Sequence, residues 1–221
     1  MGLDMYLDKA KRIDGATPKD IANVESYFDY CLRPSKYRES TMKEWCGICI
    51  DDVDMELADK YGKEYQTRYW AWDTEKKYPH LGIWEGVGYW RKANQIHNWF
   101  VENVQDGLDD CGTYEVTKAQ LINLLNVCKE VKANSKLVDG KVQNGMRVTA
   151  SRWEPITEDG KYIEDPTVAQ ELLPTTSGFF FGSEGYDQWY MMDIDYTIET
   201  LTKVLEDTDF ETEVVTYSAS W

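Results

Sequence analysis

The densest group of side chains able to make directed polar contacts lies in Tyr89–Phe100, with the sequence YWRKANQIHNWF. It combines one of the chain's two histidines with an arginine, two asparagines and several aromatic rings. An imidazole can act as a base or hold a ligand, and amides and a guanidinium recognise polar edges. These residue types therefore suit either proton transfer or the binding of a planar polar molecule.

We predict that this stretch forms a helix that reaches about Gln105 and ends before Gly107. At about 100° per residue, Trp90 and His97 share the apolar face, while Arg91 falls on its polar margin. Two interpretations of His97 follow: a hydrogen-bonded core residue, which is the more common role for a lone buried histidine, or a group that faces a ligand.

A second candidate segment, LPTTSGFFFGSEGYDQWY, combines a proline, glycines and three consecutive phenylalanines before the next helix, with Ser183 as its expected cap. Its glycine N–H groups at a helix start could hold an anion, although a tight turn beside bulky rings is the more common reason for such glycines. No catalytic residue, metal ligand or cofactor is assigned. The predicted ligand-binding residues are Trp90, Arg91, Asn94, His97, Asn98, Phe180 and Ser183.

Several segments carry a resemblance to a known family. The start MGLDMYL, the YWRKANQIHNWF stretch, the LPTTSGFFFGS segment with its following YDQWY, and the terminal YSASW together resemble an uncharacterised family of bacteriophage and prophage proteins. The resemblance leaves out residues 15–79 and the insertion at 134–170. It implies an accessory protein that acts in the cytoplasm of an infected bacterial cell, and it transfers no catalytic residue.

The cysteines allow two weaker hypotheses. Cys46 and Cys49 have the spacing of a thioredoxin-type redox pair, but no buried strand precedes them and the acidic neighbours disfavour a thiolate. The same pair could bind zinc with Cys31, His80 or Cys111, although these spacings match no standard zinc motif. A nucleophilic Cys111 with His97 as its base is a further alternative. Local packing explains the cysteines most simply.

The charge of the chain limits its partners. Forty acidic and 24 basic residues give a formal charge of −16, which disfavours binding to nucleic acid or to an anionic membrane. The excess is concentrated at the C-terminal end, since Glu184–Glu213 contains ten acidic residues and one basic residue, Lys203. This segment is either a solvated helix face or a surface for a basic host protein. No signal peptide or membrane-spanning run is expected.

The element pattern predicts an α+β fold in a single domain, 1–221, with a β-rich insertion at 134–170. Thr117 and Gln120 form a capping box for a helix whose apolar stripe begins at Leu121. Alternation near the N-terminus and a Thr- and Val-rich C-terminus predict strands that pair in a small antiparallel sheet.

Three functions remain open. The favoured one is non-catalytic binding of a small polar planar ligand, such as a nucleotide-derived defence signal that a phage would sequester. The second is an acidic inhibitor that docks its C-terminal third onto a basic host protein, as a nucleic-acid mimic would. The third is a hydrolase or transferase that uses His97.

Overall fold

The structure is a computed structural model. It describes residues 2–12, 16–17, 19–20, 23–24, 26–27, 30, 43–44, 49–61, 67–68, 80–81, 85–148, 153–178 and 181–221. The chain divides into two compact units, Met1–Lys9 with Gly86–Trp221, and Ala10–Glu85.

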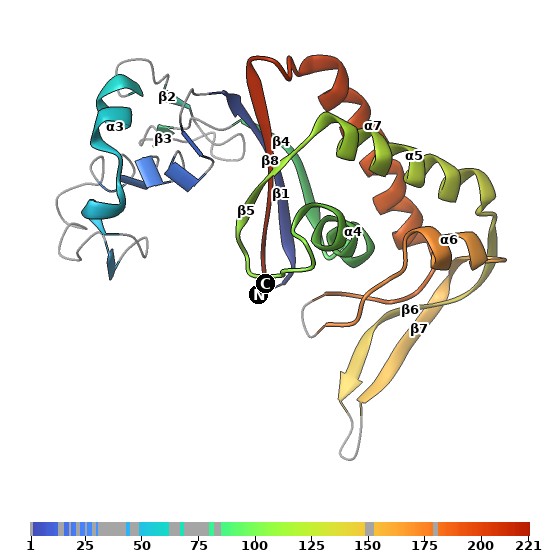
Figure 1. Ribbon diagram of the computed structural model, residues 1–221. Coiled ribbons are helices and arrows are strands. Elements are labelled where there is room, and N and C mark those ends of the chain that lie inside the picture. The colour runs from blue at the N-terminus through green and yellow to red at the C-terminus, as the bar shows by residue number, and fades with distance from the viewer. Residues whose placement is uncertain are drawn as a thin grey trace. The chain divides into compact units, whose positions relative to one another are not determined.

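The first unit is built around a four-stranded antiparallel sheet of β1 (Asp4–Lys11), β4 (Glu85–Arg91), β5 (Thr113–Val116) and β8 (Glu213–Ser220). The strand order is β4-β1-β8-β5, so the N-terminal and C-terminal strands are neighbours at the centre (Figure 1). The predicted α+β class, with both terminal strands in one antiparallel sheet, is confirmed.

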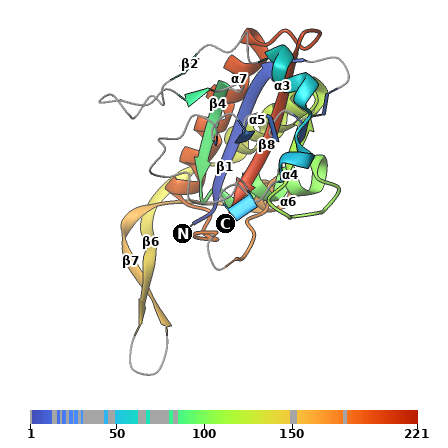
Figure 2. The same cartoon turned by 90° about the vertical axis from the view of Figure 1, so that its left-hand side faces the viewer.

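Three helices cover one face of this sheet: α4 (Asn94–Val104), α5 (Lys118–Asn134) and α7 (Gln188–Asp207) (Figures 1 and 2). A short fourth helix, α6 (Thr167–Leu172), packs against α5. Alternate residues of a strand point to opposite faces, which explains why Leu3, Met5 and Leu7 are fully buried around β1 while Tyr6 is exposed. The apolar core lies between the sheet and the helices.

Helix α5 follows its predicted pattern. The Thr117 hydroxyl accepts a hydrogen bond from the Gln120 backbone N–H, and the Gln120 side chain accepts one from the Thr117 N–H. The predicted stripe is the buried face of this helix, comprising Leu121, Leu124, Leu125, Cys128 and Val131.

Helix α4 starts later than predicted, at Asn94, because Tyr89–Arg91 complete the edge strand β4. Lys92 makes the turn between strand and helix with a φ of 63°, and its N–H donates to the Leu3 carbonyl. Trp90 is still buried, but it lies on a strand. Arg91 is exposed on that strand and does not belong to the margin of the helix.

Helix α7 also has a different cap from the one predicted. Asp187 accepts hydrogen bonds from the N–H groups of Trp189 and Tyr190, whereas Ser183 lies four residues earlier and is exposed. A carboxylate at this position also interacts favourably with the helix dipole. The apolar face is still buried as expected, through Tyr190, Ile194 and Leu201.

A long antiparallel hairpin, β6 (Leu137–Val148) with β7 (Trp153–Ile163), occupies most of the range 134–170 and extends beyond the helices (Figure 1). Gly140 pairs with Gly160 in its register. A Cβ at Gly140 would lie 2.4 Å from the Tyr162 ring, so the glycine is needed for that ring to cross the hairpin.

The second unit contains the 3₁₀ turn η2 (Ile50–Asp52), helix α3 (Met55–Tyr61) and the two-stranded pair β2 (Thr67–Arg68) with β3 (His80–Leu81). Asp54 accepts a hydrogen bond from the Leu57 N–H at the start of α3. Of the helices that the structure describes in either unit, none is long and apolar enough to cross a lipid bilayer.

Candidate functional site

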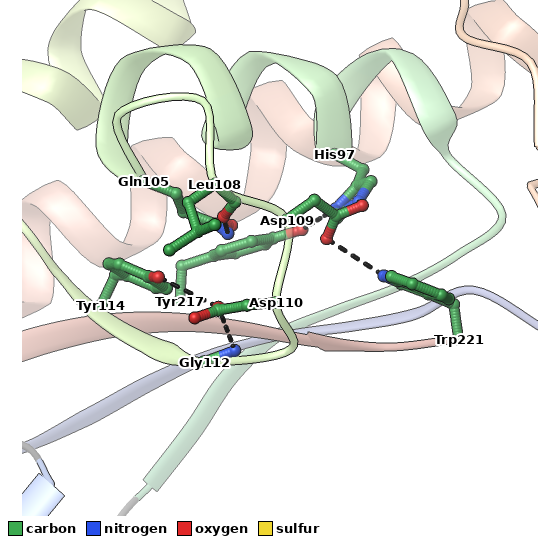
Figure 3. Close-up of polar contacts among 9 residues, drawn as sticks. All are labelled: His97, Gln105, Leu108, Asp109, Asp110, Gly112, Tyr114, Tyr217 and Trp221. Atoms are coloured by element: carbon green, nitrogen blue, oxygen red, sulfur yellow. Dashed lines mark hydrogen bonds and ion pairs between the residues drawn. The ribbon is translucent and has the colours of Figure 1, made fainter.

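His97 lies in the core of the first unit and is held on both sides by protein groups (Figure 3). Its Nδ1 is 2.7 Å from the Tyr217 hydroxyl and its Nε2 is 3.2 Å from an Asp109 carboxylate oxygen. A proton on Nε2 donates to Asp109, and Nδ1 then accepts the Tyr217 hydroxyl proton. Both ring nitrogens are therefore engaged without a ligand.

The loop that carries Asp109 is fixed at several points. The Gln105 side chain donates to the Leu108 carbonyl at 2.6 Å, and the Trp221 indole N–H donates to Asp109 at 3.0 Å. Asp106 and Cys111 have φ values of 52° and 57°, a backbone region that L-residues rarely adopt. The polar contacts around His97 therefore hold this unusual loop and the end of the chain against α4 (Figure 3).

Aromatic rings pack against the His97 network. The Tyr217 ring stacks on Phe100 with centroids 3.9 Å apart, and the Phe181 ring meets His97 edge-on at 5.3 Å. Burial raises the pKa of Tyr217 well above its ordinary value. With no exposed surface, the Tyr217 hydroxyl is a structural hydrogen-bond donor.

Asn94 is buried and fastens the segment before α7. Its Nδ2 donates to the carbonyls of Phe181 and Ser183 at 3.0 and 2.9 Å, and its Oδ1 accepts from the Thr176 N–H at 2.9 Å. The side-chain Nδ2 and Oδ1 atoms are therefore both bonded to backbone, and Asn94 holds Thr176, Phe181 and Ser183 against α4.

Other predicted ligand residues lie apart from one another. Trp90 is buried and donates its indole N–H to Thr197 at 2.9 Å. The exposed Ser183 accepts a hydrogen bond from the Gly185 N–H. Phe180 lies outside the described residues.

Asn98, in contrast, lines a cleft of about 200 Å³ between α4 and the end of α6. The α4 wall contains all the polar side chains of the lining, and the opposite wall, formed by the end of α6 and the two residues after it, is apolar. The lining residues are Gln95, Asn98, Trp99, Glu102, Asn103, Leu172, Leu173 and Pro174.

The polar wall presents two unused groups. Asn98 and Glu102 are one helical turn apart, and neither has a hydrogen bond or ion pair with any residue that the structure describes. Gln95 differs, because its amide donates to Asp193 at 3.1 Å. The cleft therefore offers an amide edge and a carboxylate beside the partly exposed Leu172 and the exposed Pro174.

The sequence does not indicate Asp109, Tyr217 and Trp221 as members of the site, because their contacts join distant parts of the chain. Glu102 was also missed, although its spacing of four residues from Asn98 on a helix was a usable signal. The Leu172–Pro174 wall could not be found without the packing of α6.

The cysteines of the described part of the chain lie in different environments. No group of three or more His, Cys, Asp or Glu side chains there could hold a metal ion. Cys111 is exposed and Cys128 is buried, and burial raises the pKa of Cys128 to about 12. Cys31 and Cys46 lie outside the described residues, so the redox and zinc hypotheses are not tested.

Comparisons with protein-family models, with curated proteins and with solved structures find no match.

Proposed function

We propose that the protein binds a small planar ligand in the α4–α6 cleft without transforming it. The observation that carries this proposal is the pair of unpartnered polar side chains, Asn98 and Glu102, beside an apolar wall. Ligand sites combine a mostly apolar surface with a few polar groups that fix orientation. An amide can pair with a ring edge that offers both a donor and an acceptor, and a carboxylate accepts an N–H.

The charge of the cleft narrows the ligand class. Among the described residues that line it, none is Lys or Arg, and Glu102 adds a negative charge. The chain as a whole has a formal charge of −16. A neutral or cationic ring with an amino or amidine group therefore fits better than an anion, and phosphates on such a ring would remain outside the cleft.

The size of the cleft supports recognition of one ring. Its volume of about 200 Å³ is below the roughly 300–1,000 Å³ of sites that enclose drug-sized ligands. A nucleotide-derived signal would thus be held by its base. The resemblance to phage and prophage proteins supports sequestration of such a signal in an infected bacterial cell.

Calorimetric titration with adenine, benzamidine and benzoate tests this proposal. Adenine and benzamidine are planar donors of N–H, and benzoate is a planar anion of similar size. We expect the first two to bind and benzoate not to bind. Equal binding of all three, or binding of benzoate alone, contradicts the proposed recognition.

Two variants locate the site. Asn98→Ala and Glu102→Gln should each weaken binding by about tenfold while leaving the unfolding temperature unchanged. Asn126→Ala is the matched control, because Asn126 is exposed on α5 and does not line the cleft. Recovery of the bound compound unchanged after long incubation separates binding from the His97-dependent enzyme alternative.

A further inference from the structure

Helix α7 carries three large apolar side chains on its solvent face. Trp189, Met192 and Tyr196 are 43%, 58% and 42% exposed. Their spacing of three and four residues puts them on one side of the helix, opposite the buried Ile194 and Leu201. The helix therefore has an apolar stripe in addition to the one that it buries.

The stripe reaches the edge of the sheet at Tyr196, whose hydroxyl accepts a hydrogen bond from the Tyr89 backbone N–H at 3.2 Å. Figure 2 shows α7 beside β4, the edge strand that carries Tyr89. The Tyr89 ring itself packs on Tyr6, 5.5 Å away, on the face of the sheet opposite the helices, because alternate strand residues point to opposite faces. We therefore define the aromatic stripe as Trp189, Met192 and Tyr196.

Its composition is that of an interface centre. Aromatic residues and Met are enriched where proteins contact one another, and Trp and Tyr dominate the residues that contribute most binding energy. Exposed apolar residues scattered singly need no such explanation, but these three follow one another at helical spacing on one side of α7.

Acidic side chains accompany the stripe. Asp195 and Glu199 are exposed on α7. Between Glu184 and Glu213 the chain has ten acidic residues and one basic residue, Lys203. The Lys132 ammonium lies 2.6 Å from Asp195 and offsets part of this charge, whereas no ion pair of Glu199 with a described residue is present.

We propose that the aromatic stripe is a docking surface for a lysine- and arginine-rich segment of a partner protein. Carboxylates attract its charged groups, and the faces of Trp189 and Tyr196 can hold a guanidinium or ammonium through cation–π contact. Nucleic acid would be repelled by the same carboxylates. This surface shares no residue with the α4–α6 cleft, so the inference stands independently of the proposed ligand.

An array of immobilised peptides with varied arginine, leucine and glutamate content tests the proposal on the full chain. We expect the protein to select peptides that combine arginine with leucine, and to bind them more weakly as salt rises. Selection of acidic or uncharged peptides, or no selection at all, would overturn it.

Two variants assign the binding to the stripe. Met192→Ser removes an apolar contact and Glu199→Lys reverses a charge, and each should weaken peptide binding about tenfold. Ile122→Ser is the matched control, because Ile122 is 42% exposed on α5 and is not part of the stripe. Thermal unfolding checks that all three variants fold. Binding that survives both stripe variants in folded protein would reduce the effect to unspecific attraction by net charge and contradict the docking surface.

Discussion

The Nδ1 atom of His97 lies 2.7 Å from the Tyr217 hydroxyl. This hydrogen bond joins helix α4 to the C-terminal strand β8, although the two residues are 120 positions apart in the sequence. The opposite ring nitrogen contacts Asp109, whose second carboxylate oxygen accepts the Trp221 indole N–H. This chain of contacts gives His97 a structural position, which is the more common of the two roles expected for it.

Replacement of Tyr217 by Phe should destabilise the protein by about 1–2 kcal/mol, because it keeps the ring stacked on Phe100 but leaves Nδ1 without a donor. Urea unfolding measures the change. Tyr114→Phe is a suitable control, since its hydroxyl bonds Asp110 at the surface and its loss should cost less than about 0.5 kcal/mol. Equal effects of the two substitutions would show that the His97 contact has no special contribution.

Variants of Asn94 and Asn98 should distinguish a residue that stabilises the fold from one that binds a ligand. Asn94→Ala removes three hydrogen bonds to loop backbone and should cost about 2–4 kcal/mol, with faster amide exchange at Thr176. Asn98→Ala, one turn further along the helix, should change stability by less than about 0.5 kcal/mol. Hydrogen exchange followed by mass spectrometry measures the amide exchange rates of both variants. An unchanged exchange rate of the segment that contains Thr176 in Asn94→Ala would contradict the anchoring role.

Ionisation of the buried Asp193 carboxyl group should lower the free energy of unfolding as pH rises. Burial raises its pKa to about 6, so between about pH 4 and 6 the folded protein keeps a proton that the unfolded chain has released. Asp193→Asn removes the cost of ionising this group and should stabilise the protein by about 1–3 kcal/mol at pH 8, with little effect near pH 3. Asp8, whose pKa is also raised to about 6 by burial, keeps part of the pH dependence in this variant.

The control for this experiment is Asp195→Asn, because the Asp195 side chain is 53% exposed and pairs with Lys132 at the surface. Urea unfolding over a pH series should show a small, pH-independent effect for it. The prediction would be wrong if the free energy of unfolding of the wild type rose between pH 4 and 6 and that of Asp193→Asn followed the same curve. Asp193 would then not be the source of the pH dependence.

The capping box of α5 gives a local prediction. Thr117→Ala removes the side-chain acceptor of the Gln120 N–H and should lower stability by about 1 kcal/mol. Thr117→Asp should restore most of the loss, since Asp is also a good N-cap. Thermal unfolding of the two variants provides the test, and failure of Asp to recover stability would speak against capping as the cause.

Local patterns predicted much of the fold. Period-2 alternation located β1, and the capping box with its apolar stripe located α5, because both signals depend on neighbouring residues. The start of α4 was misplaced because the aromatic residues before it suit a strand edge as well as a helix face. The sequence offers both Ser183 and Asp187 as caps for α7, and only packing favours Asp187.

The sequence predicts only part of the candidate site. Asn98 is a predicted ligand-binding residue and lines the cleft, but the apolar wall at Leu172–Pro174 comes from a segment about 70 residues away. Likewise, the partners of His97 lie 12 and 120 residues from it. Such pairings are set by tertiary packing, which local periodicity does not encode.

Chemical-shift mapping of the ¹⁵N-labelled protein with adenine and with benzamidine tests whether the α4–α6 cleft binds a ligand. We expect both compounds to shift the backbone signals of Gln95–Asn103 and Leu172–Leu173, together with the side-chain amide of Asn98, and we expect benzoate to shift none of them. Shifts centred elsewhere, or none with either compound at millimolar concentration, would contradict the α4–α6 cleft as a ligand site.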